Sequence, residues 1–141
     1  MALNKSGFSG GGFFKSKDYL GAKALLVEPL HSKEGKNKYG NAQTYTTCDI
    51  AVFPDEQSLE AVEPEILTGV VLGGGVLANE MAKLIGSANI LRLEEAPNSK
   101  GDKPLIVPRD CDMAVSEAVE VWYNRREAER ASAVANLDFL N

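Results

Sequence analysis

The residue types in this chain that are best suited to chemistry are lysines and aromatic residues, which occur together between residues 23 and 53. Lysine side chains attract phosphate groups, and flat rings stack on nucleic-acid bases whatever the base. Arg92, farther along the chain, extends the same basic character. We therefore expect a groove that binds single-stranded nucleic acid through Lys23, Lys33, Lys36, Lys38, Tyr39, Tyr45, Phe53 and Arg92.

Each of these residues also has an ordinary structural role open to it. Tyr45 or Phe53 can fill the interior of the domain or pack under a helix, and Arg92 can pair with an acidic residue on a neighbouring strand. The lysines can serve only to keep a segment soluble. The sequence leaves both interpretations open.

The distribution of charge assigns any nucleic-acid binding to the N-terminal third of the chain. The net charge is −5, but residues 1–40 contain seven lysines and three acidic residues. Residues 41–141 contain eight basic and seventeen acidic residues. An acidic protein can still bind nucleic acid, because the local field over a groove sets the attraction.

A glycine-rich motif predicts different chemistry. Residues 73–78 (GGGVLA) fit the G-x-G-x-x-A pattern of dinucleotide-binding folds, and Glu94 and Glu95 follow at about the expected distance of ~20 residues. That pattern belongs to alternating strands and helices, whereas here three expected strands precede it and a hairpin follows it. We therefore favour glycines that relieve crowding where a bent strand enters a helix, and we expect no nucleotide cofactor.

Other catalytic and metal-binding patterns are missing from the sequence. Neither G-x-S-x-G nor G-x-x-x-x-G-K-[ST] occurs, and the single histidine, His31, is expected to be an ordinary loop residue. Cys48 and Cys111 have no C-x-x-C spacing and are expected to be free and buried. Paired acids such as Asp55 and Glu56 suit a solvated face better than a magnesium site. We expect a protein that is not an enzyme and holds no cofactor and no metal.

Strand-length segments alternate with turn signals in the N-terminal half. Residues 21–29 (GAKALLVEP) predict a strand ended by Pro29, and residues 31–41 (HSKEGKNKYGN) predict a long basic loop. Residues 44–54 (TYTTCDIAVFP) predict a second strand by their alternation. The acidic, proline-bounded residues 54–64 favour an exposed connection. In the second strand, one face carries Cys48, Ile50 and Val52, and the other carries Tyr45, Thr47, Asp49 and Phe53.

The C-terminal half adds two helices and a hairpin. Residues 65–75 predict a third strand, and residues 76–86 predict a helix of about ten residues that ends at Gly86. Residues 89–110 predict a hairpin around the turn-rich PNSKGDKP, and residues 113–131 predict a last helix capped by Asp112. The expected apolar stripes are Leu77, Met81, Leu84 and Ile85 in the first helix, and Ala114, Ala118, Val121 and Trp122 in the second.

This order of elements predicts a mainly β fold. It matches a five-stranded OB-fold-like Greek-key barrel with a short helix between strands three and four and an appended C-terminal helix. We expect a flexible arm of glycine, phenylalanine and lysine over residues 1–17, the domain over residues 18–131, and a tail over residues 132–141. The phenylalanines of the arm, Phe8, Phe13 and Phe14, can stack on bases, dock on a neighbouring subunit or cover an edge of the core.

Four segments also resemble a known family. DYLGAKALLVEP, KYGNAQTYTTCDIAVFP, VVLGGGVLANEMAKLIG and KPLIVPRDCD, within residues 18–125, are similar to small single-stranded-DNA-binding proteins with an OB-fold found in phages of actinobacteria. The resemblance implies a K-[FY]-G step at Lys38-Tyr39-Gly40 and a strand aspartate at Asp49. This chain differs from many replication proteins, which end in a strongly acidic tail, because Asp138 is the one charged residue in 131–141.

We therefore expect a sequence-tolerant single-stranded-DNA-binding protein of phage DNA replication or recombination. Alternatives are a small β-barrel module that binds protein through the C-terminal helix and Trp122 or, less favoured, a nucleotide-cofactor-binding protein. Homo-oligomers are expected to form through the N-terminal arm or the C-terminal helix. With no apolar segment long enough for a bilayer and no secretory signal at the N-terminus, we expect a cytoplasmic protein, in the host cell if it is a phage protein, with no membrane partner.

Overall fold

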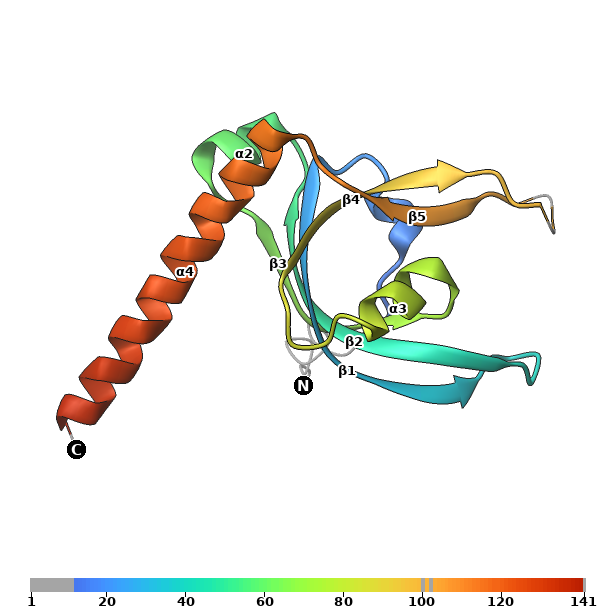
Figure 1. The fold of residues 1–141 in the computed structure, drawn as a ribbon, viewed down its shortest axis with the longest axis horizontal. Coiled ribbons are helices and arrows are strands. Elements are labelled where there is room, and N and C mark those ends of the chain that lie inside the picture. Colours follow the sequence, from blue (N-terminus) through green and yellow to red (C-terminus); the bar gives the residue numbers. More distant parts are fainter. Residues whose placement is uncertain (1–11, 100, 102, 141) are drawn as a thin grey trace, which may run out of the picture.

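The computed structural model describes residues 12–99, 101 and 103–140, with side chains described as far as residue 134. Strands dominate the first two thirds of the chain, and a long helix ends it (Figure 1). The elements are η1 (Ser16–Tyr19), β1 (Ala24–Lys36), β2 (Ala42–Phe53), α2 (Glu56–Ala61), β3 (Glu65–Gly73), α3 (Gly75–Ala82), β4 (Asn89–Ala96), β5 (Leu105–Arg109) and α4 (Met113–Leu140).

One antiparallel sheet contains the five strands in the order β3-β2-β1-β4-β5. The prediction of a mainly β fold with a helix between the third and fourth strands and a C-terminal helix is confirmed. The sheet is curved, and the β1–β2 and β4–β5 hairpins project to the same side with α3 between them (Figure 1). Among the described strands, the edge strands β3 and β5 do not pair with each other, so the sheet is not closed into the predicted barrel.

Strand β1 is longer than predicted and contains a bulge. Pro29 lies opposite Cys48 and His31 lies opposite Thr47, so Leu30 is an extra residue without a partner on β2. A proline is tolerated at such a point because it has no N–H to give to the ladder. The predicted stop at Pro29 is therefore wrong, and the predicted long loop reduces to a short turn over residues 37–41.

Both sides of the sheet are partly covered, which gives two apolar clusters. On the inner side of the curve, Ile50 and its neighbours pack against Phe14 and α3, and Thr46 donates a hydrogen bond of 2.8 Å from Oγ1 to the carbonyl of Ala78. On the outer side, Phe53 and its neighbours pack under α4 around the fully buried Val119. The alternation predicted for β2 is confirmed, because even-numbered residues face inward and odd-numbered residues face outward.

The segment before η1 belongs to the fold. Val71 of β3 donates a backbone hydrogen bond of 2.9 Å to Gly12 and accepts one of 2.8 Å from Phe14, so this segment runs parallel to the free edge of β3. Phe14 is buried and stacks on Tyr19 with ring centroids 4.6 Å apart. Residues 12–17 are thus part of the domain and not of the predicted flexible arm. Residues 1–11 of that arm, including Phe8, lie outside the described residues.

A short helix interrupts the predicted exposed connection between β2 and β3. Asp55 caps α2, because its carboxylate accepts a hydrogen bond of 2.8 Å from the backbone N–H of Ser58. Leu59 then buries its side chain under α4. The residues around α2 are strongly acidic, so this end of the domain differs in charge from the β1–β2 hairpin.

The last helix begins as predicted and extends beyond its predicted end at residue 131. Asp112 accepts a hydrogen bond of 2.9 Å from the N–H of Val115, which confirms the predicted cap, and the helix continues through most of the predicted tail to Leu140. Its buried stripe differs from the predicted one, because Val121 is 48% exposed and Ala114 is exposed. The residues that pack on the sheet are Val115, Ala118, Val119, Trp122 and Tyr123.

In α3, only half of the predicted apolar stripe is buried. Leu77 and Met81 lie in the inner cluster, whereas Leu84 and Ile85 are exposed because α3 ends at Ala82 and turns follow. Within the described residues, no helix is long and apolar enough to cross a membrane.

A partly buried ion pair fastens α4 to the sheet. Arg126 donates hydrogen bonds of 2.6 and 2.9 Å to the two carboxylate oxygens of Glu28 on β1, and these bonds keep the pKa of the guanidinium above its usual value. The same guanidinium lies 4.9 Å from the ring of Trp122 and 5.1 Å from the ring of Tyr123. The ion-paired side chains are 16% and 23% exposed, so water screens the pair only in part.

Replacing Arg126 by methionine is expected to lower the free energy of unfolding by about 1–3 kcal/mol, because Glu28 then stays partly buried without its partner. The matched control is Arg125→Met on the exposed side of α4, which should change stability by less than about 0.5 kcal/mol. Urea unfolding measures both values. Equal losses in the two variants would contradict this role of the ion pair.

Candidate nucleic-acid interface

The outer face of the sheet is open where α4 does not cover it, near the β1–β2 hairpin. The register places Lys33 of β1, Tyr45 of β2 and Gly73 of β3 in one row across the three strands. Residues directly opposite each other share a face of a sheet. Since odd-numbered residues of β2 face outward, this row faces outward too. We call it the Tyr45 row.

One glycine makes room for the ring of Tyr45 to lie on the sheet, and a second lies beside it. A Cβ added to Gly35 of β1 would lie 2.8 Å from Cε2 of Tyr45, which is too close. One added to Gly73 of β3 would lie at an ordinary 3.6 Å from Cε1 of Tyr45 and 3.2 Å from Cε1 of Phe13. The Tyr45 hydroxyl donates a hydrogen bond of 3.1 Å to the carbonyl of Lys36. The ring is therefore held close to both neighbouring strands, and its side chain is half-buried, so part of its surface stays open to solvent. We call this ring the Tyr45 platform.

Phe13 provides a second ring beside this platform. Its centroid lies 6.2 Å from that of Tyr45 with the ring planes at 60°, and the side chain is 67% exposed. The backbone bridge to Val71 fixes its position at the edge of β3. From the sequence, Phe13 and Phe14 can each stack on bases, dock on a neighbouring subunit or cover an edge of the core. The structure separates them, because Phe14 is buried and Phe13 is exposed.

The hairpin turn places further predicted residues near the Tyr45 row. The side chain of Asn37 accepts hydrogen bonds of 2.9 and 3.0 Å from the backbone N–H groups of Tyr39 and Asn41, which closes the turn. Tyr39 is 74% exposed, and the ammonium group of Lys38 lies 5.1 Å from its ring centroid. Lys36 is also exposed, but it lies on the inner face because the residues of β1 alternate.

Two predicted contacts lie elsewhere. Lys23 precedes β1, ten residues from Lys33 along the strand, and forms an ion pair of 3.7 Å with Glu56 at the acidic end of the domain. Arg92 pairs at 3.2 Å with Glu94. Hydrogen bonds from Arg109 and then Arg92 keep the pKa of the Glu94 carboxyl below its usual value. The eight predicted residues therefore do not form one continuous groove.

The expectation that Phe53 contacts nucleic acid is corrected by its burial. Its side chain is fully buried, and its ring meets that of Trp122 edge-on at 6.2 Å. Phe53 faces outward as Tyr45 does, but α4 covers that end of the face. The ring belongs to the core and is not accessible to a base.

The glycine-rich segment has the structural role that the sequence analysis favoured. Gly74 connects β3 to α3 with φ of +71°, and a Cβ on it would lie 2.5 Å from the side chain of Gln43. A side chain is therefore excluded at Gly74 by both conformation and space. Among the five strands of the sheet, β3 pairs only with β2, in antiparallel fashion, and does not form the parallel strand-helix-strand unit of a dinucleotide-binding fold.

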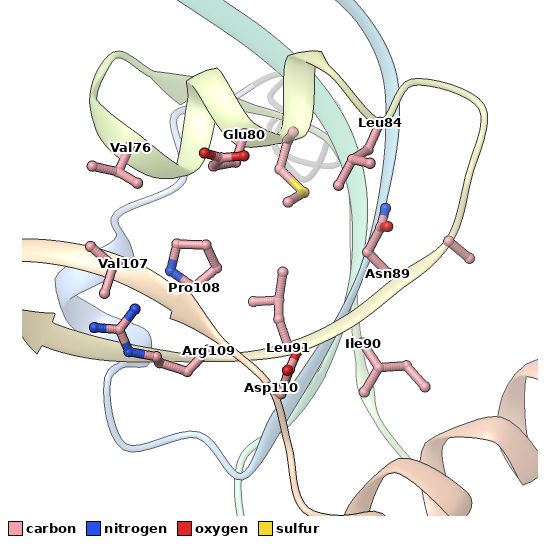
Figure 2. A pocket seen from close by; sticks show the side chains of 12 residues that line it. Val76, Glu80, Leu84, Asn89, Ile90, Leu91, Val107, Pro108, Arg109 and Asp110 are labelled. Carbon is pink, nitrogen blue, oxygen red and sulfur yellow. The ribbon is translucent and has the colours of Figure 1, made fainter.

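A separate cleft of about 690 Å³ lies between α3 on one side and β4 and β5 on the other. Figure 2 shows Val76 and Glu80 on one side, Pro108 on the other, and Leu91 pointing into it. Its charged groups are Glu80, Asp110 and Arg109, of which Arg109 pairs at 3.0 Å with Glu94. Because the remaining charge is acidic, this cleft does not suit a phosphate backbone.

The described residues include no cluster of histidine, cysteine and acidic side chains that suits a metal ion. Both cysteines are free. Burial raises the pKa of the Cys48 thiol to about 12, so that it stays protonated at neutral pH, and burial also raises the pKa of the half-buried Cys111. His31, predicted as a loop residue, lies in β1 opposite Thr47.

The chain was compared with protein-family models, curated proteins and solved structures, and none of them matches it.

The corrected role of Phe53 leads to a prediction. Replacing Phe53 by leucine is expected to lower the free energy of unfolding by about 1 kcal/mol, because a smaller side chain packs less well against Trp122. The affinity for a single-stranded oligonucleotide should not change. Thermal melting measures the stability, and fluorescence anisotropy measures the affinity. A large loss of affinity at unchanged stability would contradict this role and indicate that Phe53 contacts the oligonucleotide.

Proposed function

We propose that this protein binds single-stranded DNA without strong sequence preference and that it is not an enzyme. The observation that carries the proposal is the Tyr45 ring, which lies over two glycines with the exposed Phe13 beside it and Lys33 in the same row. A base can stack on such a ring whatever its identity, and the lysine can neutralise the adjacent phosphate.

The charge of this part of the chain supports the proposal. The described residues 12–45 contain six lysines and three acidic residues, although the protein as a whole is acidic. Stacking requires exposed base faces, which a duplex hides, so single strands should bind more tightly than duplex.

We further propose that the fold is an open variant of the OB-fold. Its strand order and the position of α3 between β3 and β4 agree with that fold, in which the β2–β3 face and the β1–β2 and β4–β5 loops bind oligonucleotides. The segment of Gly12 and Phe14 occupies the edge of β3, where it replaces part of the closing strand pair. The Tyr45 row lies on this β2–β3 face.

A role in phage DNA replication or recombination, in the cytoplasm of a host cell, is proposed on the resemblance of the four sequence segments alone.

A second candidate function, protein binding, rests on α4. Its C-terminal half extends away from the sheet (Figure 1), and Val134 there is 58% exposed. Trp122, expected from the sequence to be the contact, instead packs against Phe53 of β2 and lies beside the guanidinium group of Arg126 on the same helix. Binding through an apolar helix should depend little on salt, whereas DNA affinity falls steeply as salt rises.

Titration of a fluorescently labelled oligothymidylate at two salt concentrations tests the function itself. We expect binding at low salt, weaker binding at high salt, and weaker binding of the matching duplex at either. Absence of any binding at low salt would reject the proposal and favour the protein-binding module.

The platform is tested by two substitutions that act on the same ring. Tyr45→Ala should weaken binding by about 1–3 kcal/mol, because one stacking ring is lost. Gly35→Ala should also weaken binding, although it removes no group, because its Cβ would displace the ring. Gly21→Ala is the matched control, since nothing lies within 4 Å of a Cβ there. Melting temperatures measured beside the affinities separate a lost platform from a damaged fold; unchanged affinity in both variants would contradict the platform.

The lysines of the β1–β2 hairpin are tested by their effect on salt dependence. Replacing Lys33, which lies opposite Tyr45, and Lys38 by glutamine should weaken binding and reduce the slope of log affinity against log salt by about 1.4, because two phosphate contacts are lost. Lys23→Gln is the control, because Lys23 lies at the other end of β1 and pairs with Glu56. A slope unchanged by the double substitution would place the phosphates elsewhere.

A further inference from the structure

A recess of about 250 Å³ lies between the outer face of the sheet and α4. Ile66 and Thr68 of β3 form one wall, and Trp122, Arg126 and Arg130 of α4 form the other. The recess lies where the helix begins to leave the sheet, so one side of it remains open. We call it the helix recess.

The helix recess lies on the same face as the Tyr45 row. Asp49 and Ala51, which line it, are outward-facing residues of β2 in the same alternation as Tyr45. Asp49 follows Tyr45 by four residues, which is about 14 Å along a strand. At the stacked spacing of about 3.4 Å per nucleotide, about four nucleotide steps span that distance. Fewer nucleotides are needed where the bound DNA is more extended.

The walls of the recess suit a flat uncharged group with polar edges. Ile66 is 54% exposed and Trp122 is half-buried, so both have apolar surface without a full cover. Thr68 provides a hydroxyl group. Arg130 provides a guanidinium group, because its side chain is 60% exposed and pairs only with Glu127, at 3.3 Å, among the ion pairs of the described residues. Glu127 also pairs with Arg126, at 2.9 Å.

The acidic groups at the recess are already engaged. Glu28 accepts both of its hydrogen bonds from Arg126, and Oδ1 of Asp49 accepts one of 2.8 Å from the backbone N–H of Gly69. A phosphate group would still meet these carboxylates if it entered the recess, whereas a neutral base would not be repelled. Arg130 lies at the open side, where a phosphate can remain in water.

From this geometry we propose that the helix recess is a second base-binding site, which receives one base of a strand whose other bases stack at Tyr45 and Phe13. The inference rests on the proposed function and adds to it. The DNA strand then runs along the outer face of β2 from the β1–β2 hairpin toward α4. The shortest oligonucleotide that fills both sites must span the distance between the Tyr45 row and the helix recess.

The only tryptophan of the chain reports on this site directly. We expect an oligothymidylate of about ten nucleotides to change the fluorescence of Trp122 at saturation, because a base then lies against its ring. A thymidine dinucleotide, which binds at Tyr45 but does not reach the recess, should leave that fluorescence unchanged at saturation. Anisotropy of labelled oligonucleotides measures binding independently of Trp122.

Two arginine substitutions provide the matched comparison. Arg130→Gln should weaken binding of the long oligonucleotide about five-fold and leave the affinity for the dinucleotide unchanged. Arg125→Gln removes the same charge from an exposed position of α4 that does not line the recess, and it should change neither affinity. Equal effects of the two substitutions would mean that Arg130 only attracts DNA through its charge, as any arginine of α4 would. That result would contradict the base-binding site in the helix recess.

The outcomes separate the two proposals. Binding of the long oligonucleotide by anisotropy, with no change in Trp122 fluorescence, would overturn the recess site and leave the proposed function intact. An equal fluorescence change with the dinucleotide would also overturn it, because the signal would then not depend on reach. Absence of binding by anisotropy would reject the proposed function itself.

Discussion

The outer face of this domain depends on one extra residue in β1. Before the bulge, even-numbered residues of β1 such as Leu26 face outward beneath α4. Leu30 shifts the alternation by one, so that Lys33 and Gly35 face outward in the second half of the strand. Without that shift, Ser32 would stand where Lys33 now lies beside Tyr45, and Gly35, which makes room for the ring, would face the other way.

The bulge also lies just past the point where β1 stops pairing with β4, although β1 pairs with β2 on both sides of it. Its first half pairs with β4 from Leu25 to Val27, whereas its second half continues with β2 alone. The carbonyl of Pro29 is satisfied by the N–H of Gly86 from the turn after α3, at 3.2 Å. The long hairpin that contains the candidate interface is thereby released from the five-stranded part of the sheet, while Glu28, just before the bulge, holds α4 through Arg126.

Local patterns in the sequence predicted much of the fold. The period of two in residues 44–54 identified both faces of β2, and Asp112 identified the start of α4, because each signal depends on neighbours in the chain. The end of β1 was predicted wrongly because Pro29 is a stop signal in most strands and a bulge is not visible without the partner strand. Helix α2 was missed because its capping pair, Asp55 and Ser58, lies within an acidic segment bounded by prolines.

The candidate site was less predictable, because it depends on contacts between distant segments. Tyr45 and Phe53 have the same alternation and similar rings, and only the position of α4 makes one exposed and the other buried. Gly35 was predicted to lie in a loop, and Gly73 was predicted to relieve crowding where a bent strand enters a helix, although both lie beside Tyr45 in the sheet. Phe13 reaches the site through a backbone bridge to β3 that no local pattern indicates.

Photo-crosslinking tests most directly whether single-stranded DNA lies on the Tyr45 platform. An oligothymidylate that carries 5-iodouracil at single positions forms covalent adducts on irradiation with aromatic rings that stack on the modified base. Mass spectrometry of the digested protein then identifies the residue. The account predicts adducts at Tyr45 or Phe13, and adducts confined to the β4–β5 hairpin or to the acidic end around α2 would contradict it.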